Sequence, residues 1–433
     1  MRSTIVLLIS VAGSLAGGPA AAQTDAIPVR LSLADAVRLA EQRNPAIDVA
    51  RQRAAVVEAE TAFAKRWPNP LASVQTAGYN PKSSPVGFID RQEFTVQAAQ
   101  EFELGGQRRL RGEAAGAAAG AARSMLDDGV RQLRLEVQRV YFQLVLAGLD
   151  AAQASASLVE IDRVIAVNRS RYAQGEVSGG ELRRLEVERL KFSEDALQAE
   201  LAMRHSRSAL LALLSAPRLD LPVEPTDTLT PPAERSDGVV APADGQGSAA
   251  ALTSQALAAR PDIAAARREQ TRAESEVAVQ KALRTPNLSI AAGYRRDFGA
   301  NGLVLAATLP LPILDRNAPG VARAEAERQL AASLLKAREL AVSLDVQQAA
   351  DLADVNRRRV SAIERDYLQK AREAREAVLA AYRAGEGGLL DYLDAERAYR
   401  DVQRAYNRAL YDHRLSLIQL DAAVGAGAKG LLP

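Results

Sequence analysis

Residues 382–399 read YRAGEGGLLDYLDAERAY, and residues 172–189 read YAQGEVSGGELRRLEVER. Aligned on each other, both stretches begin with Tyr-x-x-Gly-Glu and continue into a charged segment with helical character. The second copy carries Asp391 and Asp394 where the first copy has a glutamate and an arginine. A phrase that recurs within one chain indicates an internal duplication.

The similarity extends over most of the chain. Two pairs of segments correspond, and each half then offers a second apolar run: 33–60 with 252–277, 67–79 with 285–294, and the runs 94–104 and 303–314. Each half is therefore expected to read helix, strand, strand, long helix, helix. The expected organisation is a signal peptide, a first repeat, a Pro- and Gly-rich connector, a second repeat and a tail: 1–22, 23–215, 216–250, 251–425 and 426–433.

The stretch 105–172 predicts one very long helix. It contains no proline and holds apolar residues seven apart in two seams. The first seam is Leu126, Leu133, Val140, Ala147, Ala154 and Ile161. Spacing of seven residues over such a length predicts coiled helices on the order of 100 Å long.

The apolar runs carry a different message. Each is about ten residues long, which is the length of a strand that crosses a bilayer when tilted. Four strands cannot close into a barrel, and an open sheet edge leaves backbone groups unpaired in lipid. The expectation is a barrel shared by three copies, with about twelve strands. The alternative is a small periplasmic β-domain below a coiled coil.

The N-terminus predicts export. Arg2 precedes a short apolar run, and Ala20 and Ala22 form an A-x-A site, so a secretory signal is expected to end at Ala22. An N-terminal membrane anchor is the alternative. No cysteine follows the site, so no lipid anchor is expected on the mature N-terminus.

Composition excludes several classes of function. Fifty-five basic residues face fifty-three acidic ones, which gives no reason to expect a nucleic-acid partner. The chain has no cysteine, and its two histidines, His205 and His413, each lie inside a patterned helix. We find no catalytic grouping, no metal-ligand cluster and no cofactor motif, so no enzyme activity, resident metal or cofactor is expected.

The duplication and the phrase Tyr-x-x-Gly followed by Asp-x-Leu-Asp-Ala resemble the TolC family of outer-membrane efflux proteins. The specific segments are 382–396, RNPAI at 43–47 and ARPDI at 259–263. The strand-to-helix junctions, 100–109 and 309–320, look most like the branch that serves heavy-metal pumps of the cobalt-zinc-cadmium type. The resemblance implies a mixed α/β membrane protein: a trimeric twelve-stranded β-barrel in the outer membrane that continues into a periplasmic α-helical coiled-coil barrel.

The resemblance also implies roles for particular residues. Asp391 and Asp394 match the acidic constriction of the periplasmic gate, although a helix N-terminus also favours acids for its dipole alone. Hairpin tips that contact an adaptor are implied at Tyr172, Gly175, Tyr382 and Gly385. The bend where strands give way to helices is implied at Leu104, Gly105, Gly106, Pro310 and Pro312. Gly387 stands where many members have a basic residue that latches the closed state.

The expected function is the outer-membrane channel of a tripartite RND-type pump, a homotrimer that binds a periplasmic membrane-fusion adaptor and an inner-membrane transporter. Heavy-metal cations are the expected cargo, conducted passively through a gated pore. The alternatives are a multidrug or type I secretion duct and, from another class, a periplasmic coiled-coil adaptor or scaffold. An exported hydrolase would need a nucleophile or a metal cluster, and the sequence offers neither.

Overall fold

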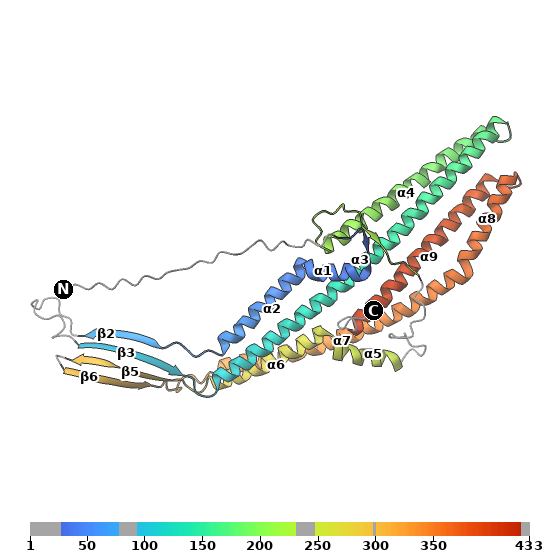
Figure 1. Ribbon diagram of the computed structural model, residues 1–433. Coiled ribbons are helices and arrows are strands. Elements are labelled where there is room, and N and C mark those ends of the chain that lie inside the picture. Colours follow the sequence, from blue (N-terminus) through green and yellow to red (C-terminus); the bar gives the residue numbers. More distant parts are fainter. Residues whose placement is uncertain (1–26, 78–92, 231–246, 298–299, 426–433) are drawn as a thin grey trace, which may run out of the picture.

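A computed structural model describes residues 27–77, 93–230, 247–297 and 300–425. The chain is elongated, with a β-sheet at one end and two helix hairpins at the other (Figure 1). The expected signal peptide and the tail 426–433 lie outside the described residues.

The two halves of the chain contain matching elements, as the duplication predicts. The first half runs β1 (Arg30–Leu31), α1 (Leu33–Arg43), α2 (Pro45–Ala64), β2 (Leu71–Ala77), β3 (Glu93–Phe102), α3 (Gln107–Ala173) and α4 (Gly179–Leu213). After β4 (Glu224–Pro225), the second half runs α5 (Gly247–Ala259), α6 (Pro261–Ala282), β5 (Leu288–Asp297), β6 (Ala300–Thr308), α7 (Ala318–Ala362), the π-helix η1 (Ile363–Leu368), α8 (Gln369–Ala384) and α9 (Leu389–Val424).

The opening helix of each half is two helices, which corrects the expected single one. The break falls at Asn44–Pro45 and at Arg260–Pro261, because a residue before proline is pushed out of the helical region. The residue before each proline also holds the last helix of its own half. Asn44 Nδ2 donates to Leu213 O at 2.9 Å, and Arg260 Nη1 donates to Ala423 O at 3.3 Å.

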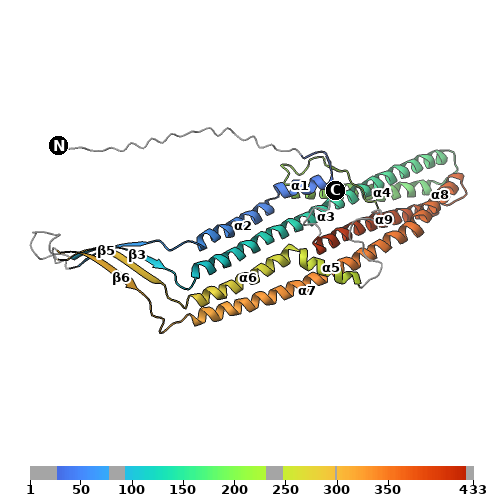
Figure 2. The ribbon, with the colours of Figure 1, turned by 60° about the horizontal axis from the view of Figure 1, so that its bottom comes forward.

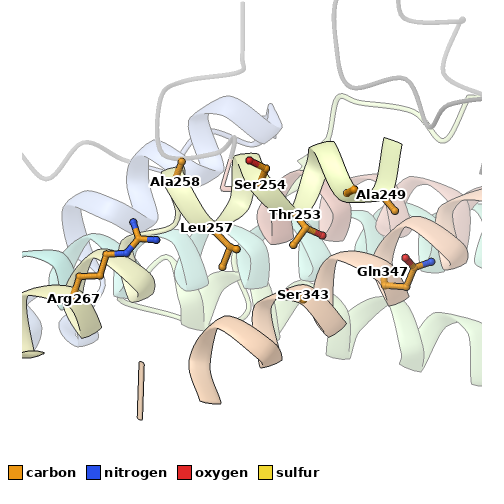
Figure 3. Close-up of a pocket in the computed structure, with 9 residues that line it drawn as sticks. Ala249, Thr253, Ser254, Leu257, Ala258, Arg267, Ser343 and Gln347 are labelled. Carbon is orange, nitrogen blue, oxygen red and sulfur yellow. The ribbon is translucent and has the colours of Figure 1, made fainter. Parts of the chain in front are cut away.

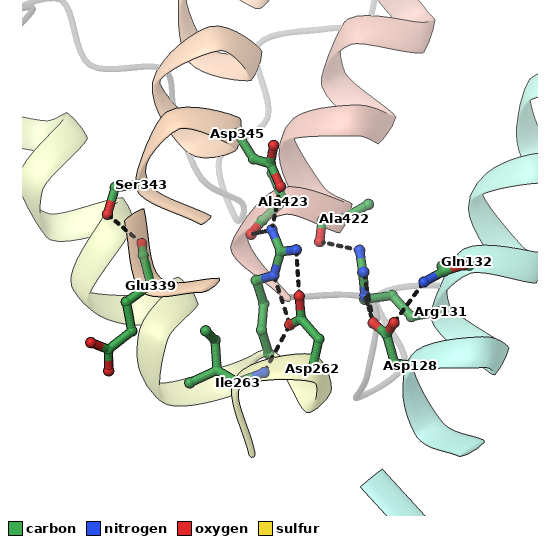
Figure 4. A network of polar contacts seen from close by, with 11 residues as sticks. Asp128, Arg131, Gln132, Asp262, Ile263, Glu339, Ser343, Asp345, Ala422 and Ala423 are labelled. Carbon is green, nitrogen blue, oxygen red and sulfur yellow. Dashed lines mark hydrogen bonds and ion pairs between the residues drawn. The ribbon is translucent and has the colours of Figure 1, made fainter. Parts of the chain in front are cut away.

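The second of these contacts belongs to a larger polar network (Figure 4). Arg260 pairs with Asp262 at 2.8 Å, and Arg131 donates to Ala422 O at 3.1 Å while pairing with Asp128. Burial raises the pKa of Asp262, but the Arg260 guanidinium outweighs it and holds that pKa below the usual range. Two arginines from different halves thus satisfy carbonyls at the C-terminal end of α9.

The long helix of the first half is confirmed as α3. Five residues of its first predicted seam are buried, and Leu126 is partly buried: Leu133, Val140, Ala147, Ala154 and Ile161. Its counterpart is interrupted, because α7 passes through η1 before it becomes α8. A π-helical turn inside an α-helix often marks a functional position.

The helices beside the sheet form one layer. In Figure 2, α2, α3, α6 and α7 lie side by side in that order, and each contacts the next. α2 and α7 are therefore the outer members of the layer. By length and composition, α3 is the one helix of the described residues that could cross a membrane, but 39% of its apolar window is buried inside the chain.

The four strands form one antiparallel sheet in the order β2-β3-β5-β6. Its two faces differ in chemistry. One row on the first face crosses the sheet through Val74, Val96, Tyr294 and Leu303, and the next through Ala72, Ala98, Ala292 and Leu305. Rows on the opposite face are more polar or small: Ser73, Gln97, Gly293 and Val304, then Gln75, Thr95, Arg295 and Gly302.

The more polar face is crowded around Gly293. A Cβ atom added there would lie 2.3 Å from Val96 O and 2.6 Å from Gln97 Cβ. Glycine in a strand marks such a close backbone approach. The crowding shows that β3 and β5 approach each other closely on this face.

Two expected boundaries differ from the structure. The last strand ends at Thr308 and not at 314, because Pro310 and Pro312 have no N–H for a sheet ladder. The connector 216–250 is partly structured. Val223 is buried, β4 pairs with β1, and α5 begins at Gly247.

Candidate functional site

The hairpin tips at the end opposite the sheet hold the repeated phrase (Figure 1). Gly175 and Gly385 have φ of 77° and 83°, the left-handed conformation that ends a helix. In both turns the next amide reaches back into the helix: Glu176 N donates to Arg171 O and Glu386 N to Ala381 O, each at 2.9 Å. These bonds place both glycines where the sequence predicts helix ends.

The helices that follow the two turns begin differently. Ser178 Oγ accepts a hydrogen bond from Glu181 N at 3.2 Å and caps α4. Gly388 stands at the same place before α9 and has no side chain to cap with. Asp391 lies in the uncapped first turn of α9, where a negative charge is favoured.

The two tyrosines of the repeated phrase have different surroundings. The side chain of Tyr172 is 50% exposed, whereas that of Tyr382 is 5% exposed. Tyr382 stacks on Tyr392, with ring centroids 5.5 Å apart and 9° between the planes. Its hydroxyl donates to Asn168 Oδ1 at 2.8 Å and lies 3.4 Å from Glu181 Oε1. The ring of Tyr382 is therefore buried between the hairpins, and its place among the tip positions that meet an adaptor stays a prediction.

Backbone contacts reinforce this junction of the hairpins. The guanidinium of Arg171 donates to Tyr382 O at 3.3 Å and also to Arg383 O. Arg383 pairs with Glu160 at 3.0 Å. The tip of the second hairpin is thus fastened to α3 of the first half.

Asp391 and Asp394 both lie on the surface of α9. The Asp394 carboxylate pairs with Arg397 at 3.3 Å, and Arg397 also lies 3.4 Å from Glu188. No ion-pair partner of Asp391 occurs among the described residues. Asp391 and Asp394 therefore place two exposed carboxylates near the tip of the second hairpin.

Buried charges further from the tip were not predicted from the sequence. Glu396 is 3% exposed and pairs with Arg375 at 2.5 Å. Arg400 pairs with Asp195 at 3.0 Å and lies 4.1 Å over the Phe192 ring. Glu396 had one signal, its match to Glu186 in the repeated phrase.

The junction residues lie where the sheet gives way to helices. Gly105 and Gly106 have φ of 79° and 73°, and Gly106 precedes the first turn of α3. Leu104 is 40% exposed. On the other side, Pro310 and Pro312 lie between β6 and α7, which follows Asn317 at φ 55°. Left-handed residues at both junctions turn the chain sharply from strand to helix.

A groove and the metal-ligating side chains are two further candidates for a site. A groove between α5 and α7 is lined by Thr253, Ser254, Leu257, Ser343 and Gln347 (Figure 3). No group of three or more His, Cys, Asp or Glu that could hold a metal ion occurs among the described residues.

Comparison with known proteins defines the class. Residues 252–426 match the family model described as outer membrane efflux protein. Together with the relatives below, this match bears out the resemblance to TolC-family outer-membrane efflux proteins.

Particular relatives refine the class. The cobalt-zinc-cadmium resistance protein CzcC of Cupriavidus metallidurans is 25% identical over 344 residues, 76% of this chain and 77% of that protein. The pyoverdine export outer membrane protein OpmQ of Pseudomonas putida is 27% identical over 328 residues, 71% of this chain and 68% of that protein. The structure of CusC matches with a TM-score of 0.76 at 18% identity, over 91% of this chain and 92% of that one, which shows the fold.

Proposed function

We propose that three copies of this chain form the outer-membrane duct of a tripartite pump for heavy-metal cations, with passive conduction through a gate at the hairpin tips. The supporting observation is the sheet. β2 and β6 each have a strand neighbour on one side only, among the described residues. Its apolar rows suit lipid and its more polar, crowded face suits a water-filled lumen.

The open edges require other strands. Unpaired backbone groups in the hydrocarbon region cost several kcal/mol each, by the usual order of magnitude. Three copies that pair β6 with the next β2 close the barrel with about twelve strands, an even number. The apolar row Val74, Val96, Tyr294 and Leu303 then faces the acyl chains.

The helical layer has open edges too, and one of them is apolar. Val49, Val56 and Phe63 of α2 are seven residues apart and 50%, 62% and 78% exposed. The equivalents of Val49 and Phe63 in α6, Ala265 and Val279, are 3% and 5% exposed in a helix that packs against both α3 and α7. The duplication therefore predicts that α2 packs against α7 of the next copy.

The hairpin tips, at the end of the chain opposite the sheet, are the proposed place of the gate and of the contacts with partner proteins. Asp391 and Asp394 would gather into a ring of carboxylates around a threefold axis. Tyr172, Gly175 and Gly385 lie at the tips, where a periplasmic adaptor and an inner-membrane transporter would dock. A signal peptide ending at Ala22 would bring the chain to the periplasm.

The cargo assignment rests on the similarity to CzcC and on the junction sequences. The test is growth of a strain that lacks the gene on graded cadmium, zinc, cobalt and copper, beside dyes, detergents and antibiotics. Selective loss of metal tolerance, restored by the intact gene, is the expected result. Sensitivity to organic compounds with normal metal tolerance would overturn the metal assignment and favour an organic cargo, as the similarity to the pyoverdine exporter allows.

The assembly has its own test. Native mass spectrometry of the detergent-extracted protein should give the mass of three chains. A second measurement uses Phe63→Ser, which should weaken the trimer, beside Tyr367→Ser on the 60% exposed ring of η1, which should not. A single-chain mass for the intact protein would contradict the shared barrel.

A further inference from the structure

We propose that the hydroxyl of Tyr172 donates a hydrogen bond to the Asp391 carboxylate of a neighbouring copy, and that this pair ties adjacent copies at the tips. The inference rests on the assembly proposed above and assigns one contact within it. It also gives a role to a tyrosine that the chain leaves exposed.

The duplication supplies the geometry, because the same contact is already made inside one chain. Tyr382 lies three residues before its left-handed glycine, and its hydroxyl lies 3.4 Å from Glu181, six residues after the other glycine. Tyr172 and Asp391 stand at these same two places with the halves exchanged. First and second hairpins alternate around a ring of three copies. The contact that the second hairpin makes with the first hairpin of its own chain then recurs between that first hairpin and the second hairpin of the neighbouring copy.

Tyr172 is available for this contact. Its ring is 50% exposed, and its hydroxyl has no hydrogen-bond partner among the described residues of its own chain. The ring lies against Gly179, where an added Cβ would meet Tyr172 Cε2 at 3.3 Å. Gly179 therefore leaves room for the ring and keeps the hydroxyl near the start of α4.

Asp391 is the acceptor that the exchange of halves selects. It is exposed, and no ion pair holds it within the described residues, whereas Asp394 pairs with Arg397 at 3.3 Å. Inside the chain Tyr382 donates mainly to Asn168, at 2.8 Å. The equivalent of Asn168 is Val378, which cannot accept, so the Asp391 carboxylate remains as the acceptor for Tyr172.

The contact between copies is weaker than the contact within a chain. Arg171 binds two carbonyls of the second hairpin, but its equivalent is Ala381, which makes no such bonds. The two hairpins of one chain then move as one body, and the tips separate at the boundaries between copies. Asp391 then takes part both in the proposed ring of carboxylates and in these boundaries, whereas Asp394 takes part in the ring alone.

Cross-linking tests the contact directly, because the chain has no cysteine of its own. Tyr172→Cys with Asp391→Cys, treated with a short bis-maleimide in intact membranes, should give linked dimers and trimers on denaturing gels. Arg383→Cys with Glu160→Cys, a pair 3.0 Å apart that joins the two hairpins of one chain, is the control and should link within one chain and run as a monomer. Tyr172→Cys with Asp48→Cys, far from the tip, should also stay monomeric.

The outcomes are separable. A trimer by native mass that shows only monomers after linking 172 to 391 overturns this contact and leaves the proposed function standing. A single-chain mass for the intact protein overturns both. Conductance gives a second readout: Tyr172→Phe and Asp391→Ala should each raise the open fraction, and the double variant should add little to either single change. Full additivity would show that the two side chains do not interact.

Discussion

The hydroxyl of Tyr382 in α8 donates to Asn168 Oδ1 in α3 at 2.8 Å, across more than two hundred residues of chain. Asn168 is itself held, because its Nδ2 donates to Val164 O at 2.8 Å. The contact joins the second hairpin to the first at the point where both approach the tip. It makes the two hairpins of a chain mechanically dependent on each other.

Tyr382→Phe should loosen this junction. The substitution leaves the buried Asn168 oxygen without its donor, at a cost of roughly 1–3 kcal/mol. We expect a lower thermal midpoint and a higher resting conductance in planar bilayers. Tyr367→Phe, on an exposed ring, is the control. Equal behaviour of the two variants would rule out a role for the hydroxyl.

Asp391→Asn with Asp394→Asn should change the pore without changing the fold. Both side chains are on the surface, so removing their charge has little effect on packing. We expect higher resting conductance and weaker block by polyvalent cations, measured on single channels. Asp127→Asn, an exposed acid in α3 far from the tip, should leave block unchanged. Unaltered block in the double variant would remove the gate role.

Gly293→Ala should prevent proper assembly of the sheet. The added Cβ would lie 2.3 Å from the Val96 carbonyl, and the backbone must shift to make room. Overpacking of this kind costs typically about 1–3 kcal/mol. Gly302→Ala in β6 is the matched control, since its nearest neighbour would be Arg295 O at 3.9 Å. Heat-stable trimer on gels should fall for the first variant and persist for the second.

His413 should make the helical part less stable in mild acid. Burial lowers the pKa of this imidazole, and the nearby charges of Arg357 and Arg414 lower it further. The unfolded chain takes up a proton near the ordinary pKa of about 6.5 while the folded chain resists it, so stability falls as the pH drops through that value.

The measurement is the thermal midpoint at pH 7.5 and pH 5.5. His413→Gln should show a smaller loss on acidification than the wild type, while His205→Gln, on an exposed position, should match the wild type. Equal losses in all three proteins would show that His413 does not couple to stability.

Local signals made much of the fold predictable. The spacing of seven residues between Leu133, Val140 and Ala147 predicted α3, and the apolar runs predicted all four strands. The prolines account for the differences from the predicted elements: Pro45 and Pro261 divide the opening helices, and Pro310 ends β6 early. Each of these effects is local, and each could have been drawn from the sequence.

The site was less accessible to sequence reasoning. Tyr172 and Tyr382 occupy the same phrase, yet only Tyr382 is buried, and Asn168, which accepts its hydroxyl, is replaced by Val378 in the other half. The pairing of Arg400 with Asp195 depends on how two distant helices approach. Such contacts are tertiary, and no spacing within one helix specifies them.

The two open edges of the sheet have a consequence for the cell that makes this protein. In the proposed assembly, a single chain exposes the unpaired edges of β2 and β6, so its insertion into lipid is unfavourable. Insertion then requires all three copies, because a pore through the membrane forms only when every strand of the barrel is present. Incomplete assemblies do not enter the bilayer. The requirement for hydrogen bonds between the edge strands therefore preserves the permeability barrier, and the same bonds later stabilise the channel.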